Sequence, residues 1–295
     1  MRPHEVLSGL LAARLEPGSQ AWLADAQREL TAGTSPTRFA ELVALCSRHV
    51  KRAPLAPTAQ ERERAGAALE GWDPERWDRL DAARASLALS LADADGVAAE
   101  LTLDEAFRHA DVGELVALYR ALPLFPRPER FRWRMGEGAR SNMRAVYEAA
   151  CCDNPFPARH FDDTAWRSCV LKSLFVGAPL WRVWGLDGRL DSELARMALD
   201  FAEERRSAGR PVPPALWLCL GTHGGARALT SMERELRDGP REGRAGAALA
   251  LARAGETARL ALVIEGERDR ELGAMMARAL DGASSQTAFA SLPTA

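Results

Sequence analysis

The sequence predicts an all-α protein built from many short antiparallel helices. Alanine occurs 55 times in the 295 residues, whereas valine, isoleucine and threonine together occur only 24 times. Because β-branched residues favour strands, this composition supplies too few of them for a large sheet. Repeated amphipathic segments with helix-start signals indicate the same class. In the C-terminal third, pairs of short helices about 30 residues apart would resemble a HEAT-like or other α-solenoid array.

Residues 1–121 are expected to form an N-terminal helical array. Two prolines in 52–57 interrupt the helical pattern, and GWDP at 71–74 supplies Asp73 as a capping residue with Pro74 at the first position of a further helix. The apolar periodicity predicts the other helices of this array at 4–15, 20–31, 37–50, 58–69, 96–110 and 112–121.

Residues 122–222 are expected to form a central domain with a pocket. Three prolines in 122–131 predict a loop, and Pro155 and Pro157 predict an extended path into a buried helix. Helices are expected at 137–150, about 163–176, 191–206 and 213–221. We expect 153–217 to form the core of the molecule, with 1–52 as a peripheral layer.

Alanine, arginine, glycine and glutamate dominate residues 223–283. This segment is expected to form C-terminal helical pairs, and residues 284–295 a disordered tail. The four helices of the pairs are expected near 225–237, 242–254, 257–265 and 268–281.

Net charge and hydropathy argue against nucleic-acid-binding, secreted and membrane-spanning proteins. The 39 basic and 41 acidic residues leave a net charge of −2, which argues against general nucleic-acid binding. No apolar run reaches the roughly 7–15 residues of a signal peptide or the roughly 20 of a membrane span. We therefore expect a cytoplasmic protein without membrane insertion. The five cysteines form no CxxC motif and are expected to be buried thiols.

Several motifs that would identify a reaction do not occur in the sequence. There is no GxxxxGK[ST], GxGxxG, HExxH, ExxH or GxSxG, and the five histidines are scattered. The sequence therefore assigns no cofactor, metal or reaction.

Four motifs in the middle of the chain resemble the EboA family, bacterial proteins encoded with the ebo group of small-metabolite genes. They are NPFPARHFDD (154–163), AWRSCVLKSLF (165–175), GAPLWRVWGLDGR (177–189) and ELARMALDFAEERRSAGRPVPPALW (193–217). The chain departs from the family at 167–169, where it has Arg-Ser-Cys in place of a frequent Asn-x-Met, which weakens the case for a polar role at Arg167. The resemblance implies cytoplasmic work around a secondary metabolite and its export or maturation, without implying a reaction.

His160, Asp162 and Asp163 lie at the entry to the expected buried helix. An aspartate at a helix start is first of all a cap and a partner for the helix dipole, contributing about 0.5–2 kcal/mol. Two adjacent carboxylates and an imidazole exceed what capping requires. A His/Asp acid–base pair or a weak divalent-cation site is therefore the functional alternative.

Lys172 is one of only two lysines against 37 arginines, and it lies in an otherwise apolar helix. A compact, titratable amine would suit nearby carboxylates or an anionic ligand, whereas a lysine that extends to the surface is the structural alternative. The candidate catalytic residues are therefore His160, Asp163 and Lys172.

Aromatic and charged side chains supply the candidate ligand-binding residues. Four of the eight tryptophans fall within 52 residues, as either a packed core that includes Trp217 or the walls of a pocket for a flat, apolar metabolite. Polar residues of 191–206 form either solvated i, i+4 ion pairs or partners of His160. The candidate ligand-binding residues are Asn154, Arg159, Asp162, Trp166, Trp181, Arg182, Trp184, Arg189, Arg196, Asp200 and Glu204.

Three functions fit the sequence. The first is a non-enzymatic accessory protein that binds a small-metabolite intermediate or a partner enzyme of the pathway. The second is an enzyme acting on a small metabolite with a His/Asp/Lys pocket. The third is a scaffold that docks proteins on its alanine- and arginine-rich C-terminal helices.

Overall fold

The computed structural model describes residues 1–91 and 97–292, and these residues form an all-α fold, as predicted. Within the described ranges no β-strand occurs, and the bridge between Pro54 and Asp78 stands outside any strand. Close contacts divide the chain into two compact units, Met1–Asp162 and Asp163–Ala295. This division differs from the expected boundaries after residues 121 and 222. It also distributes 153–217, expected to form a single core, over both units.

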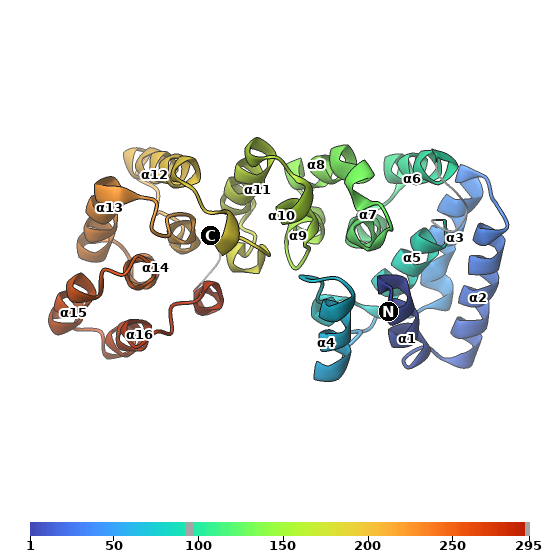
Figure 1. Ribbon diagram of the computed structural model, residues 1–295, viewed down its shortest axis with the longest axis horizontal. Coiled ribbons are helices and arrows are strands. Elements are labelled where there is room, and N and C mark those ends of the chain that lie inside the picture. The colour runs from blue at the N-terminus through green and yellow to red at the C-terminus, as the bar shows by residue number, and fades with distance from the viewer. Residues whose placement is uncertain (92–96, 293–295) are drawn as a thin grey trace. The chain divides into compact units, whose positions relative to one another are not determined.

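The first unit contains ten α-helices and three short 3-10 helices in its described residues (Figure 1). The α-helices are α1 (Pro3–Ala12), α2 (Pro17–Thr31), α3 (Pro36–His49), α4 (Ala59–Ala68), α5 (Arg79–Ser90), α6 (Val97–His109), α7 (Val112–Ala121), α8 (Arg132–Arg140), α9 (Arg144–Cys151) and α10 (Phe156–His160). The 3-10 helices are η1 (Pro74–Arg76), η3 (Leu122–Leu124) and η4 (Pro128–Phe131).

Helix α5 is the centre of the first unit. Every residue from Leu80 to Ser90 is buried, and α1, α2, α3 and α7 pack around it (Figure 1). Small alanine and serine side chains allow this close approach on all faces. Arg84 is buried among them, where it donates to the carbonyl oxygen of Val43 at 3.1 Å and pairs with Glu114 at 3.4 Å. A buried arginine needs such partners because an unpaired charge is costly in the interior.

Three local expectations in the first unit are wrong. The helix expected at 137–150 is broken at Ser141, so that α8 and α9 are separate helices. The expected loop at 122–131 contains η3, which is buried, and η4. The expected extended path at Pro155 and Pro157 is instead the start of α10. Prolines are tolerated there because the first turn of a helix has no internal partners for its N–H groups.

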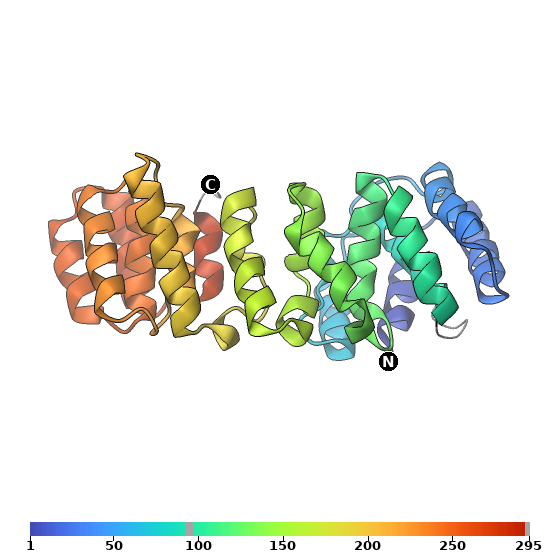
Figure 2. The ribbon, with the colours of Figure 1, turned by 90° about the horizontal axis from the view of Figure 1, so that it is seen from above.

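The second unit contains six α-helices and four 3-10 helices in its described residues. They are α11 (Asp163–Val176), η5 (Leu180–Arg182), η6 (Asp187–Arg189), α12 (Ser192–Ser207), η7 (Pro214–Cys219), α13 (Gly225–Asp238), α14 (Arg241–Arg253), α15 (Thr257–Gly266), α16 (Arg270–Leu280) and η8 (Gln286–Ser291). Helix α14 packs against α13, α15, α16 and η7, and Figure 2 shows the orange and red helices side by side. The repeat interpretation of these helices stays a prediction.

The segment expected to be a disordered tail is structured as far as residue 292. Helix η8 buries Phe289, which is 1% exposed. The side-chain amide of Gln286 donates to the carbonyl oxygens of Trp181 and Val183, each at 2.8 Å. The buried ring of Phe289 and the side-chain amide of Gln286 thus anchor this segment.

Candidate functional site

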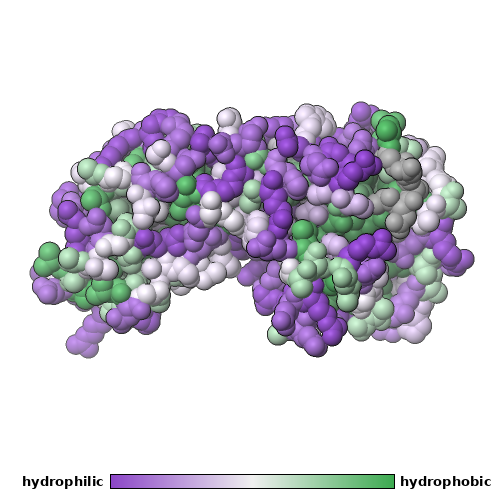
Figure 3. Space-filling model, in the orientation of Figure 1, coloured by the Kyte–Doolittle hydropathy of each residue, from purple (hydrophilic) through white to green (hydrophobic). Residues whose placement is uncertain are grey.

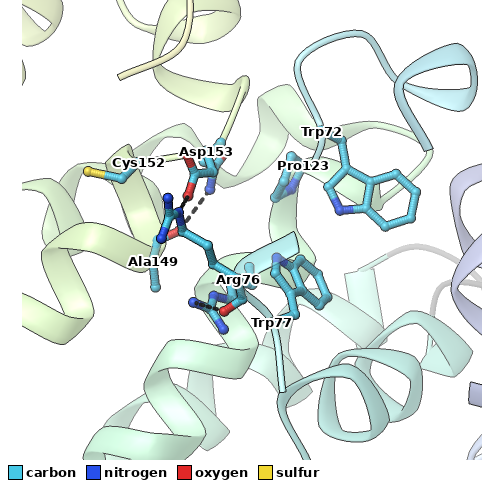
Figure 4. Close-up of a pocket in the computed structure, with 9 residues that line it drawn as sticks. Trp72, Arg76, Trp77, Pro123, Ala149, Cys152 and Asp153 are labelled. Carbon is cyan, nitrogen blue, oxygen red and sulfur yellow. Dashed lines mark hydrogen bonds and ion pairs between the residues drawn. The ribbon is translucent and has the colours of Figure 1, made fainter. Parts of the chain in front are cut away.

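Two tryptophans flank a short turn in the first unit. Asp73 caps η1 by accepting from the amide of Glu75 at 3.0 Å, and it also accepts from Nε of Arg62 at 3.0 Å. This turn directs Trp72 and Trp77 toward each other, with ring centroids 6.1 Å apart and ring planes at 60°. Both indoles are buried, with exposed fractions of 2% and 5%. They form the aromatic wall of a pocket (Figure 4).

A guanidinium group from α7 lies beside this wall. Arg120 places its Cζ 5.7 Å from the centre of the Trp77 ring, within the range of cation–π attraction. It donates to the carboxylate of Asp81 and, at 3.2 Å, to the carbonyl oxygen of Arg76. Burial raises the pKa of Asp81 above its ordinary value, although the charge of Arg120 opposes this shift. The ion pair thus fixes Arg120 in the lining of the pocket.

The end of α9 and the turn after it form the third wall. Asn154 is buried and uses both ends of its amide, donating to the carbonyl oxygen of Ala149 and accepting from the amide of Phe156, each at 2.9 Å. Asp153 adopts a φ of 50°, a left-handed conformation that is strained for a residue with a side chain. Its carboxylate lies 3.7 Å from Nε of Arg76. Cys152 completes this wall.

The pocket has an enclosed volume of about 10 Å³, close to the space of one water molecule. In Figure 4 the indole nitrogen of Trp72 lies on the side of the ring that faces Pro123, another lining residue. This nitrogen is buried and has no hydrogen-bond partner among the described residues. An unpaired buried donor costs about 1–3 kcal/mol. The arrangement is therefore suited to an oxygen acceptor, supplied by water or by one end of a ligand.

The predicted residues of the first unit have mainly structural contacts. Asn154 lines the pocket of Figure 4. Arg159 donates to the backbone and side-chain oxygens of Glu70, at 3.2 and 2.9 Å. The His160 ring packs against Phe156 with centroids 4.7 Å apart, and burial lowers the pKa of His160. Asp162 is exposed.

In the second unit, Asp163 belongs to a cluster at the start of α11. Its carboxylate accepts from Arg189 at 2.8 Å, and the guanidinium of Arg189 lies 4.9 Å from the centre of the Trp166 ring. Trp166 is 1% exposed and donates from Nε1 to the carbonyl oxygen of Arg189 at 3.2 Å. Asp163 thus forms an ion pair although its side chain is 71% exposed, and the candidate catalytic set is distributed over both units, since His160 belongs to the first.

Arg167 forms a structural ion pair, although its departure from the EboA pattern had argued against a polar role at this position. Its Nη2 lies 2.7 Å from the carboxylate of Asp191, which in turn accepts from the amide of Leu194 as the cap of α12. The pair with Arg167 lowers the pKa of Asp191. A cation at this position therefore connects α11 to the start of α12.

The remaining candidates of the second unit are distributed over its surface and its 3-10 helices. Arg196 and Asp200 form an exposed i, i+4 pair at 2.6 Å, and Glu204 pairs with Arg210 at 2.9 Å, as expected for a solvated face. Lys172 on α11 is half-buried. Three further candidates are half-buried as well, namely Trp181 and Arg182 in η5 and Trp184 after it.

The described residues contain neither a candidate metal cluster nor a candidate membrane-spanning helix. Among them, no group of three or more His, Cys, Asp or Glu side chains is placed to hold a metal ion. Within the same ranges, every helix is too short or too polar to cross a bilayer. The face shown in Figure 3 is mainly hydrophilic, with scattered hydrophobic side chains.

Most of the pocket was missed by the sequence reasoning. The segment GWDPERW (71–77) was expected only to begin a helix, and the tryptophans proposed as pocket walls all lie after residue 160. The signal that could have indicated the pocket is the spacing of Trp72 and Trp77 around a proline-containing turn, which brings two large rings together. Arg120 carried no such signal, because its place beside Trp77 depends on the packing of α7 against α5.

A family model described as metabolite traffic protein EboA matches residues 4–221. The match therefore includes the first unit and its pocket, well beyond the motifs at 154–217 that carry the resemblance. No curated protein and no solved structure gave a match.

Proposed function

Because the chain belongs to the EboA family of metabolite traffic proteins, we propose that it is a non-enzymatic accessory protein that binds a small metabolite in the pocket of Figure 4. The observation that carries this proposal is the buried, unpartnered indole N–H of Trp72. The ligand is an intermediate of a secondary-metabolite pathway, handled in the cytoplasm on its way to export or maturation. A partner enzyme of that pathway would deliver or receive it.

The enclosed volume determines which part of the ligand is recognised. A space of about 10 Å³ accommodates one oxygen atom rather than a whole metabolite. The ligand would therefore insert a carbonyl or similar acceptor toward Trp72, while the rest of the molecule extends from the open side of the pocket. A flat ring suits that part, because indole and guanidinium faces favour stacking.

The charges around the pocket favour a neutral acceptor. The guanidinium of Arg120 is paired with Asp81, and that of Arg76 lies 3.7 Å from the carboxylate of Asp153. Two cations are thus accompanied by two anions, which leaves no net positive charge to attract a strong anion. An amide, ketone or lactone oxygen fits this environment better than a carboxylate or phosphate.

The two alternative functions have weaker support. An enzyme based on His160, Asp163 and Lys172 would have to use the Asp163 carboxylate in competition with Arg189, which pairs with it at 2.8 Å. A docking scaffold would use the arginines of α13–α16, several of which form ion pairs inside the unit, such as Arg241 with Asp269.

The proposal is tested by calorimetric titration of the full-length protein with benzamide, benzoate and benzylamine. We expect benzamide, which carries a neutral acceptor, to bind most tightly, and benzylamine, which lacks an acceptor oxygen, most weakly. Trp72→Phe keeps a ring but removes the donor, so it should weaken benzamide binding about tenfold, the equivalent of one hydrogen bond.

Trp133→Phe is the matched control, because Trp133 is 63% exposed and lies outside the pocket. Benzamide should bind this variant as tightly as the wild type. Equal affinities for Trp72→Phe and wild type, or tighter binding of benzoate than of benzamide, would contradict the proposed recognition.

A further inference from the structure

A second hollow lies in the first unit between α1, α2 and α5, apart from the residues of the tryptophan pocket. It has a volume of about 130 Å³ and is partly open to solvent. The residues that line it, here called the α1–α2 groove, are Ser8, Leu11, Ala12, Leu15, Gln20, Leu23, Ala24, Gln27 and Ser86. None of these nine residues is ionisable.

Leucines form the buried surface of the groove. Leu11, Leu15 and Leu23 are 2%, 9% and 6% exposed, and they come from the end of α1, the turn after it and the middle of α2. Ala24 and Ser8 are exposed and lie at the rim. Small residues at the rim leave the leucine surface accessible from outside.

The side chains of Gln20, Gln27 and Ser86 in the groove form hydrogen bonds within the protein. The side-chain amide of Gln20 donates to the carbonyl oxygens of Ala12 and Leu15, at 2.9 and 2.7 Å, and so satisfies acceptors at the end of α1. The amide of Gln27 donates to the hydroxyl of Ser86 at 2.7 Å. A ligand would therefore meet mainly hydrocarbon.

From this lining and volume we propose that the α1–α2 groove binds a small apolar six-membered ring. An apolar cavity of about 150 Å³ holds benzene, and the groove is nearly that large. The absence of ionisable residues from the lining disfavours charged ligands, whose desolvation would have no compensation. This site uses different residues from the proposed metabolite pocket, so either can fail without the other.

The probe is toluene, titrated into the full-length protein and followed by the NMR signals of ¹³C-labelled leucine methyl groups. The wild type should show saturable shifts for Leu11, Leu15 and Leu23. Because the ligand is small, the dissociation constant should be on the order of 1 mM. Benzoate, which has a similar ring and a charge, should bind at least tenfold more weakly.

Two variants fill the groove from opposite rims, and one matched variant does not. Ala24→Leu on α2 and Ser8→Leu on α1 should each weaken toluene binding at least tenfold. Ala21→Leu is the control, because Ala21 is also exposed on α2 but does not line the groove. All three changes are at exposed positions and should leave the helical circular dichroism spectrum unchanged.

Saturable toluene binding that is lost in both filled variants and kept in Ala21→Leu supports the site. No saturable shift of the leucine methyl groups in the wild type would overturn it. Undiminished binding in Ala24→Leu, or benzoate binding as tight as that of toluene, would overturn it equally.

Discussion

Replacing Arg206 by methionine should remove the cation from a buried ion pair between α12 and α13. Arg206 is bonded to the carboxylate of Glu235 at 2.8 Å, and to the hydroxyl and carbonyl oxygens of Ser231 at 2.7 and 3.1 Å. The side chains of Arg206 and Glu235 are only 10% and 4% exposed. The methionine side chain would keep most of the apolar contact but would leave Glu235 as an uncompensated buried charge.

The expected loss follows from this burial. Removing one partner of a buried pair typically costs about 3–5 kcal/mol, because the remaining charge is desolvated without compensation. Replacing both partners, as in Arg206→Met with Glu235→Leu, should recover most of this loss, since well-packed apolar residues can substitute for such a pair. Arg196→Met is the control, because Arg196 is 54% exposed and its ion pairs with Glu193 and Asp200 are solvated.

The assay is native-state hydrogen exchange followed by mass spectrometry on peptides from α12 and α13. It measures the free energy of opening in the second unit, independently of the stability of the first. Arg206→Met should lower this free energy by about 3–5 kcal/mol, and Arg196→Met should change it far less. A loss below about 1 kcal/mol for Arg206→Met, or no recovery in the double variant, would refute the reasoning.

Three further predictions concern stability and reactivity. Gly246→Ala should destabilise the second unit by about 2 kcal/mol in urea unfolding, because the added Cβ would collide with a backbone oxygen of η7. Gly273→Ala is the control, because a Cβ there meets no atom closer than 3.9 Å, and this change should stabilise the unit slightly. Hydrogen bonds from Arg14, which follows α1, lower the pKa of Glu61 to about 2. About 1–2 kcal/mol of stability should therefore be present above pH 4.5 and be lost as the pH falls toward 2. Glu61→Gln should reduce this pH dependence of stability, and an unchanged acid-unfolding profile in that variant would contradict the prediction. Burial raises the pKa of Cys46 and Cys219 to about 12, so neither thiol should react with iodoacetamide at pH 8 until the protein is unfolded, and labelling of the native protein would contradict this.

Helix ends were predictable where neighbouring residues determine them. A helix was expected to begin at residue 191, and Asp191 caps it by accepting from the amide of Leu194. Asp73 with Pro74 was also correct as a helix start, although the helix is the short η1. Pro155 was misleading, because a proline that ends one element can equally begin the next, and the choice depends on tertiary contacts.

The pocket was less predictable, because its walls come from segments far apart in the sequence. Trp72 and Trp77 are close in the chain, but Arg120 and Asn154 reach them only through the packing of α7 and α9. The buried Arg84 shows the same limit, since a charged residue in an amphipathic pattern is normally assigned to the surface. Local rules thus predict helices better than they predict which helices meet.

The most direct test of metabolite binding is the indole N–H resonance of Trp72 in a ¹⁵N spectrum of the full-length protein. Trp72→Phe assigns it, because one of the eight tryptophan signals disappears in that variant. Titration with benzamide should shift this signal downfield in a saturable manner as the N–H gains an acceptor, while the exposed Trp133 signal stays in place. A Trp72 resonance that does not move at saturating benzamide would contradict the account.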